Sequence, residues 1–317
     1  MTGGSAHRNM HVLKQIIEAY KIPKDEFYLS VKVKENWMKL PITITQIAHQ
    51  PKILPLDKIV KSSAFTVKQL SQNAFISKED ENIRPTEVGT IVDYLSRYVL
   101  LADEHAFDVA NDKAKQDLIH GIIPVKEYKK LLDQEERLGY LVKDLSDVDS
   151  LSDEAIYLAT DICAWEDAFR SGRYVKPKVH PDKLTTEHIK MMIQRVEEFF
   201  EEFGWPIRDA FFAKAENGFV SGDGDYLLKQ TLLDLKVSVK TTMQISWVRQ
   251  LLLYYTLGFY NHFNKEDIER LMIFNARTNT VFFIDIADID QSIFEFVYDA
   301  AEKQSKINER ELRKYIN

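Results

Sequence analysis

The most constraining feature of the sequence is a change in hydrophobic periodicity after residue 203. Before this point the apolar residues recur with helical spacing, at residues 12–20, 86–102, 125–141, 152–172 and 186–203. After it, apolar runs and turn residues predict strands within 209–228, 231–239 and 270–287, a helix at 245–260 and a closing helix at 289–304. The sequence therefore predicts an α/β (α+β) fold with helices packed on a mixed sheet. Ser152 and Thr186 are the expected N-caps of their helices.

Residues 222–238, GDGDYLLKQTLLDLKVS, predict a β-hairpin. If Lys229 and Gln230 form its turn, Asp225 faces Asp234 at about 5 Å, and Lys236 shares the face of Asp234. Two facing carboxylates repel each other, and a divalent cation such as Mg²⁺ or Mn²⁺ would remove the repulsion. The hairpin thus predicts either a metal site suited to hydrolysing a phosphodiester or a surface hairpin whose exposed face is merely charged.

Three motifs follow one another in the second half of the chain: Gly222-x-x-Asp225, Asp234-x-Lys236 and Gln250-x-x-x-Tyr254. This succession resembles the PD-(D/E)XK nuclease superfamily, and most of all its RecB-like branch, which includes lambda-type exonucleases. The resemblance implies a restriction-endonuclease-like mixed sheet flanked by helices. It implies a Mg²⁺ or Mn²⁺ site formed by Asp225, Asp234 and the carbonyl of Leu235.

The resemblance also assigns roles to the remaining motif residues. Lys236 would position the attacking water, while Gln250 and Tyr254, four residues apart on one helix face, would hold the lysine or a backbone phosphate. Without the strand motifs, the same pair would be read as polar residues of the core. Tyr255 is expected to point elsewhere, into the core.

An upstream segment, Gly89-Thr-Ile-Val-Asp93, resembles the first motif of the same branch, with aspartate where histidine is usual. Aspartate also binds hard cations, so Asp93 is a further candidate metal ligand, and Glu87 and Glu166 are the next choices. The alternative for Asp93 is an exposed acid on an amphipathic helix. Arg97 is expected to form a surface ion pair with Asp93 or to reach a phosphate.

The resemblance implies an N-terminal region at residues 1–85 and a nuclease-like domain at residues 86–317. The domain would contain a helical insertion at about 103–210 and its core motifs at 218–287. The expected function is metal-dependent hydrolysis of DNA, or of RNA, by an exonuclease or an endonuclease in DNA repair, phage recombination or phage defence. The alternative is a non-catalytic protein of this fold that binds nucleic acid or a protein partner, and self-association is also compatible with the sequence.

Composition bears on partners and location. The formal net charge of −7 predicts no general attraction to nucleic acid, so a polyanion would need a local patch. Residues 169–183, FRSGRYVKPKVHPDK, are such a patch or a solvated linker. The single cysteine, Cys163, is expected in the core of a cytoplasmic protein, and no apolar run is long enough for a membrane helix.

Overall fold

A computed structural model describes residues 42–72, 75–119, 121–143, 145, 147–171, 174–261 and 268–313, so the helix expected at 12–20 lies outside the described residues. Its α-helices are α3 (Ile44–Ala48), α4 (Pro85–Leu95), α5 (Asp108–Ile119), α6 (Val125–Val142), α7 (Asp153–Ser171), α8 (Lys183–Phe203), α9 (Ile245–Asn261) and α10 (Gln291–Arg313). Its strands are β1 (Thr66–Gln69), β2 (Phe211–Lys214), β3 (Ser221–Gly224), β4 (Tyr226–Leu228), β5 (Thr231–Lys236), β6 (Arg270–Asn275) and β7 (Thr280–Asp285). A π-helical turn (Ser96–Leu100) extends α4, and short 3₁₀ turns lie at Leu56–Lys58, Ser62–Ala64, Val148–Ser150 and Ile286–Asp288.

The main sheet has five strands in the order β1-β7-β6-β5-β4. Strands β5 and β6 are parallel and are joined through α9, whereas the other neighbours are antiparallel. Strands β2 and β3 form a separate two-stranded sheet. The predicted mixed sheet with flanking helices is therefore confirmed at the level of fold class.

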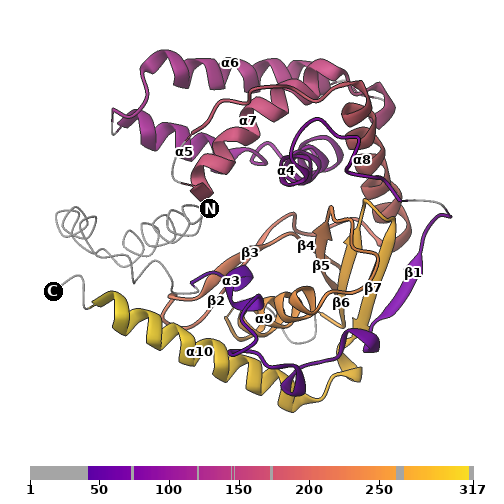
Figure 1. Ribbon diagram of the computed structural model, residues 1–317, viewed down its shortest axis with the longest axis vertical. Coiled ribbons are helices and arrows are strands. Elements are labelled where there is room, and N and C mark those ends of the chain that lie inside the picture. Colours follow the sequence, from indigo (N-terminus) through magenta and orange to yellow (C-terminus); the bar gives the residue numbers. More distant parts are fainter. Residues whose placement is uncertain are drawn as a thin grey trace.

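Helices cover both faces of the main sheet (Figure 1). On one face, α4 and α8 share a hydrophobic cluster with sheet side chains such as Leu233, Leu235 and Phe274, and α7 packs on α4. On the other, α9 packs on β5 and β6 in a cluster that includes Leu232, Ile273 and Phe282, and α3 and α10 pack against α9. Because successive strand residues point to opposite faces, both cores draw on the same strands, which accounts for the continuous apolar runs in β5 and β6.

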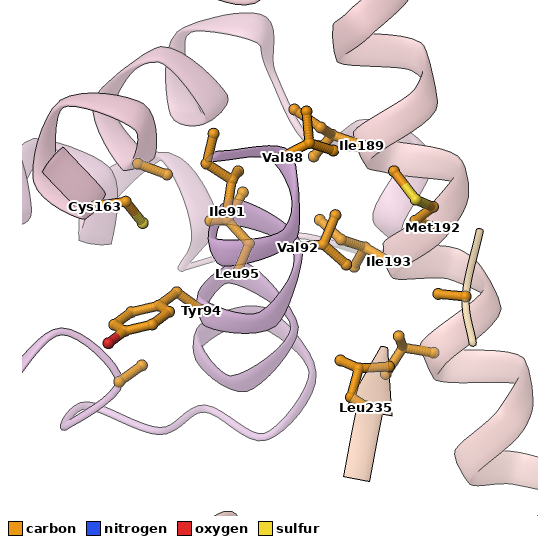
Figure 2. Close-up of a cluster of buried hydrophobic side chains, with 14 of the residues drawn as sticks. Val88, Ile91, Val92, Tyr94, Leu95, Cys163, Ile189, Met192, Ile193 and Leu235 are labelled. Carbon is orange, nitrogen blue, oxygen red and sulfur yellow. The ribbon is translucent and has the colours of Figure 1, made fainter. Parts of the chain in front are cut away.

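Helix α4 is held at the centre of the first core (Figure 2). Val88, Ile91, Val92 and Leu95 are all fully buried on it, at the spacing of one helical stripe. They contact Ile189, Met192 and Ile193 of α8, as well as Leu235 of β5. Cys163 of α7 is buried in the same cluster, as predicted. This packing fixes the polar side of α4 next to the end of β5.

Two predicted N-caps have different outcomes. Ser152 accepts a hydrogen bond from the Ala155 amide at 3.1 Å, so it caps α7 as predicted. Thr186 was the wrong residue for α8, because the helix begins earlier, at Lys183, and Asp182 accepts from the Thr185 amide. Asp182 therefore caps α8, before the first apolar residues of its buried face.

Segments outside the region that carries the sequence motifs contribute to the main sheet and its packing. Strand β1 pairs with β7, and α3 packs against α9, although both lie before residue 85. From the region expected to be a helical insertion, α8 packs directly on the sheet, where Phe199 stacks on Phe274 with ring centroids 4.4 Å apart. No helix in the described part of the chain combines the length and the apolar character needed to cross a membrane.

Candidate functional site

The hairpin of β4 and β5 has the predicted register. Leu228 pairs with Thr231 and Leu227 with Leu232, and Lys229 and Gln230 form the turn. Asp225 lies immediately before β4, where the chain leaves the β2–β3 sheet and joins the main one. The site is therefore located where two sheets meet.

Asp225 reaches across to the backbone of β5. Its Oδ2 accepts a hydrogen bond from the Leu235 amide at 2.7 Å. Burial and the charges of Asp234 and then Asp93 raise the pKa of Asp225 to about 8. Burial also raises the pKa of Asp234, whose side chain is only 2% exposed, against the opposing effect of Lys236. Asp234 is thus close enough to affect the ionisation of Asp225, as the register predicts.

Lys236 is held by groups from its own strand and from α9. Its Nζ lies 2.5 Å from Asp234 Oδ2 and donates to Gln250 Oε1 at 3.1 Å. Burial alone would lower the pKa of Lys236, but the charges of Asp234 and Asp225 outweigh it and raise the pKa. The lysine is therefore a fixed cation next to both carboxylates, with its side chain 20% exposed.

Gln250 and Tyr254 lie on the same face of α9 and form a chain of hydrogen bonds. Gln250 Nε2 donates to Tyr254 Oη at 3.2 Å, and Tyr254 Oη donates to the Asp223 carbonyl at 2.6 Å. Gln250 therefore contacts the lysine, and Tyr254 contacts Gln250. Tyr255 is buried against Phe294, as expected.

The upstream helix brings Asp93 to the same place, although more than a hundred residues separate it from the hairpin in sequence. Arg97 Nη2 lies 3.2 Å from Asp93 Oδ2 and 3.8 Å from Asp225 Oδ1, so it connects the two acids. Tyr226 also donates to Asp93 Oδ1, at 3.3 Å. The predicted ion pair of Asp93 and Arg97 forms, but its expected surface location is wrong, because the Arg97 side chain is only 17% exposed.

The two fallback acids take other positions. Glu87 pairs with Arg84, and its carboxylate accepts from the Arg84 amide at the start of α4. Glu166 is buried in α7, a helix that packs on α4, α5 and α6.

Sequence reasoning missed two residues at this site. Thr45 of α3 accepts from Gln250 Nε2 at 3.3 Å, and the sequence around it carries no signal for this role. Tyr226 directly follows Asp225, and the Arg97 guanidinium lies 5.4 Å from its ring centroid. The strand alternation predicts only that Tyr226 points away from Asp225, and its contact with α4 depends on how that helix packs.

The carboxylates at the hairpin are the candidate ligands for a hard cation such as Mg²⁺. Within the described ranges, no group of three or more His, Cys, Asp or Glu side chains is arranged to hold a metal ion. Asp225 and Asp234 supply two carboxylates, the number that Mg²⁺ commonly takes from a protein before water and substrate phosphates complete its shell. Lys236 forms an ion pair with Asp234 Oδ2. The Leu235 amide donates a hydrogen bond to Asp225. A two-carboxylate site therefore fits these residues, and it requires Lys236 to yield one oxygen.

Comparisons with known proteins identify no relative. No family model matches the chain, and neither a curated protein nor a solved structure matches it.

Proposed function

We propose that the chain is a divalent-cation-dependent nuclease that hydrolyses phosphodiester bonds of DNA. The observation that carries the proposal is the position of Lys236, which lies against Asp234 and Gln250 next to Asp225. Three separate elements, the start of β4, the end of β5 and one face of α9, supply these groups. The hairpin followed by a helix and a parallel strand also supports a restriction-endonuclease-like sheet. DNA repair, phage recombination and phage defence are all settings in which such an activity is used.

Each residue has a role that its contacts support. Asp225 and Asp234 would hold Mg²⁺ or Mn²⁺, with the Leu235 carbonyl as a further oxygen donor. When bound, such a cation lowers the pKa of a coordinated water and stabilises charge on a phosphate. Lys236, moving off Asp234 Oδ2 but staying on Gln250, would orient the attacking water. Tyr254 would keep Gln250 in place through their hydrogen bond.

The second candidate is a non-catalytic protein of the same fold that binds nucleic acid or a protein partner. One observation favours it: Lys236 and Arg97 already offset two of the three carboxylate charges, so most of the repulsion is relieved without a cation. A protein that had lost its metal would be left with such internal ion pairs. The two functions differ in whether a cation displaces the lysine from Asp234.

The test is single-turnover cleavage of labelled linear and circular DNA in Mg²⁺ or Mn²⁺, together with calorimetric titration of Mn²⁺. Lys236→Ala should abolish cleavage and keep Mn²⁺ binding, because both carboxylates remain. Asp234→Asn should lose both. Lys229→Ala, in the exposed turn of the same hairpin, is the matched control and should cut like the wild type.

The outcomes separate the candidates. Cleavage of the linear DNA alone would identify an exonuclease, because exonucleases require an end. A wild-type protein that binds DNA but neither cuts it nor takes up Mn²⁺ would establish the non-catalytic function. Cleavage by Lys236→Ala at the wild-type rate would show that the lysine has no part in the chemistry.

A further inference from the structure

Asp93, Arg97 and Tyr226 form a hydrogen-bonded cluster in which Arg97 lies between Asp93 and Asp225. Arg97 engages Asp93 through two prongs, Nε to Oδ1 and Nη2 to Oδ2, each at 3.2 Å. The hydroxyl of Tyr226 adds a third hydrogen bond to Oδ1, at 3.3 Å. Both oxygens of Asp93 are therefore engaged in fixing the guanidinium, which favours a positioning carboxylate over a metal ligand.

The same contacts leave donor capacity on Arg97. Its Nη2 is 3.8 Å from Asp225 Oδ1, too far for a hydrogen bond, although close enough for strong attraction. The hydrogen bonds to Asp93 use Nε and Nη2, so the donors of Nη1 take no part in that pairing. A guanidinium has five N–H donors in a rigid fork that matches the oxygens of a phosphate. Arg97 thus has donors beyond those that hold Asp93, next to the carboxylate that is the first candidate cation ligand.

The backbone at Arg97 is also unusual. Arg97 belongs to the π-helical turn Ser96–Leu100, a distortion that is often found at functional sites. Its carbonyl accepts from two amides, those of Leu101 and Asp103, at 3.1 and 3.2 Å. The Tyr226 ring, 5.4 Å from the guanidinium, supports the side chain from the strand. Contacts to both the backbone and the guanidinium therefore fix the position of Arg97.

We infer that Arg97 binds a backbone phosphate of the nucleic acid next to the cation site, and that Asp93 acts as the positioning residue for Arg97. This inference rests on the proposed function. When Asp225 binds a cation, its attraction for Arg97 is weakened, and the donors that Asp93 does not engage can bind a phosphate oxygen. The acid that replaces the usual histidine would then serve to orient an arginine.

The test uses the full chain and two probes, Mn²⁺ alone and a short fluorescein-labelled single-stranded DNA. The variants are Arg97→Met, Arg97→Lys, Asp93→Asn and the double variant Asp93→Asn with Arg97→Met. Arg137→Met is the matched control, because Arg137 forms an exposed ion pair with Glu154 on the helical side of the molecule. DNA binding is measured by anisotropy in Ca²⁺ over a range of salt concentrations, and thermal unfolding establishes that each variant folds.

Arg97→Met should weaken DNA binding by about tenfold to a hundredfold, the usual effect of losing a hydrogen-bonded charge. It should also reduce the salt dependence by about one phosphate contact. Arg97→Lys should recover part of the affinity. Asp93→Asn should weaken DNA binding and leave Mn²⁺ affinity unchanged, and the double variant should bind DNA no more weakly than Arg97→Met.

Three results would overturn the inference. One is an affinity of Arg97→Met for DNA that equals the affinity of the Arg137→Met control. If Arg97→Met does not fold, the equivalent result is an Asp93→Asn variant with the wild-type affinity for DNA and the wild-type salt dependence. Another is loss of Mn²⁺ binding in Asp93→Asn, which would make Asp93 a ligand. The last is a wild type that binds neither probe, which would refute the proposed function as well. If the wild type binds Mn²⁺ and cuts DNA while Arg97→Met binds DNA normally, only the present inference fails.

Discussion

Asp225 is the residue whose ionisation matters most to the account. Its carboxylate lies close to those of Asp234 and Asp93, and burial is the largest reason why its pKa is raised to about 8. In the unfolded chain the pKa would be near 3.8. At a pH between these two pKa values, the folded state therefore binds a proton that the unfolded state has lost.

A pH dependence of stability follows from this shift. Because the folded pKa is the higher one, the contribution of Asp225 is fully present below about pH 4 and is lost as the pH rises through about 8. In EDTA, the melting temperature should fall over this window, and Asp225→Asn should flatten the decline. Thermal unfolding across the window measures both. A wild-type profile that rises toward pH 8 and is unchanged by the substitution would contradict the raised pKa.

At the scale of elements, the junction of β2, β3 and β4 sets the position of the site. Gly224 pairs with Phe211, and a Cβ at Gly224 would lie 1.9 Å from the Phe211 ring. The same ring packs edge-on against Tyr254, with centroids 5.5 Å apart. Glycine is required here because an aromatic ring crosses the strand, and that ring supports the hydrogen-bonded face of α9.

Gly224→Ala should therefore destabilise the protein by about 1–3 kcal/mol, the usual cost of overpacking. Phe211→Leu in the same chain should restore part of the loss, because the smaller side chain makes room. Gly89→Ala is the control: its Cβ would meet Val237 at 3.7 Å, an ordinary contact, and alanine favours the helix. Urea unfolding measures all three. Equal stability of Gly224→Ala and wild type would show that the strands adjust freely.

The extent to which sequence predicts structure also differs among elements. The hairpin register was predictable because a two-residue turn fixes every pair, and the face of α9 because Gln250 and Tyr254 are four residues apart. Helix α5 was not, because charged Lys113 and Asp117 are buried on it in place of an apolar stripe. Strand β1 was not either, because all four of its residues are exposed and show no alternation. The inward position of Arg97 depends on how α4 packs against the hairpin, which local patterns do not encode.

At the scale of the whole molecule, a buried ion pair joins the segment before α4 to the sheet. Arg277, in the turn between β6 and β7, donates to both oxygens of Glu81 at 2.6 and 3.0 Å. Their side chains are 1% and 0% exposed, and His188 of α8 also contacts Glu81. The pair thus links three regions that are far apart in sequence.

Arg277→Met should destabilise the protein by about 3–5 kcal/mol, because it leaves Glu81 buried without its partner. Adding Glu81→Gln should recover a large part of this loss, since the second change removes the stranded charge. Denaturant unfolding of the single and double variants gives the coupling between them. Additive losses would show that the two side chains do not depend on each other.

The most direct test of the central claim, that Asp225 and Asp234 hold a divalent cation beside Lys236, is a crystal structure of the protein grown with Mn²⁺ and measured for anomalous scattering. We predict one peak bonded to both carboxylates at about 2.0–2.2 Å, with Lys236 withdrawn from Asp234 Oδ2 and still hydrogen-bonded to Gln250. No peak between the two aspartates, with the lysine unmoved on Asp234, would contradict it.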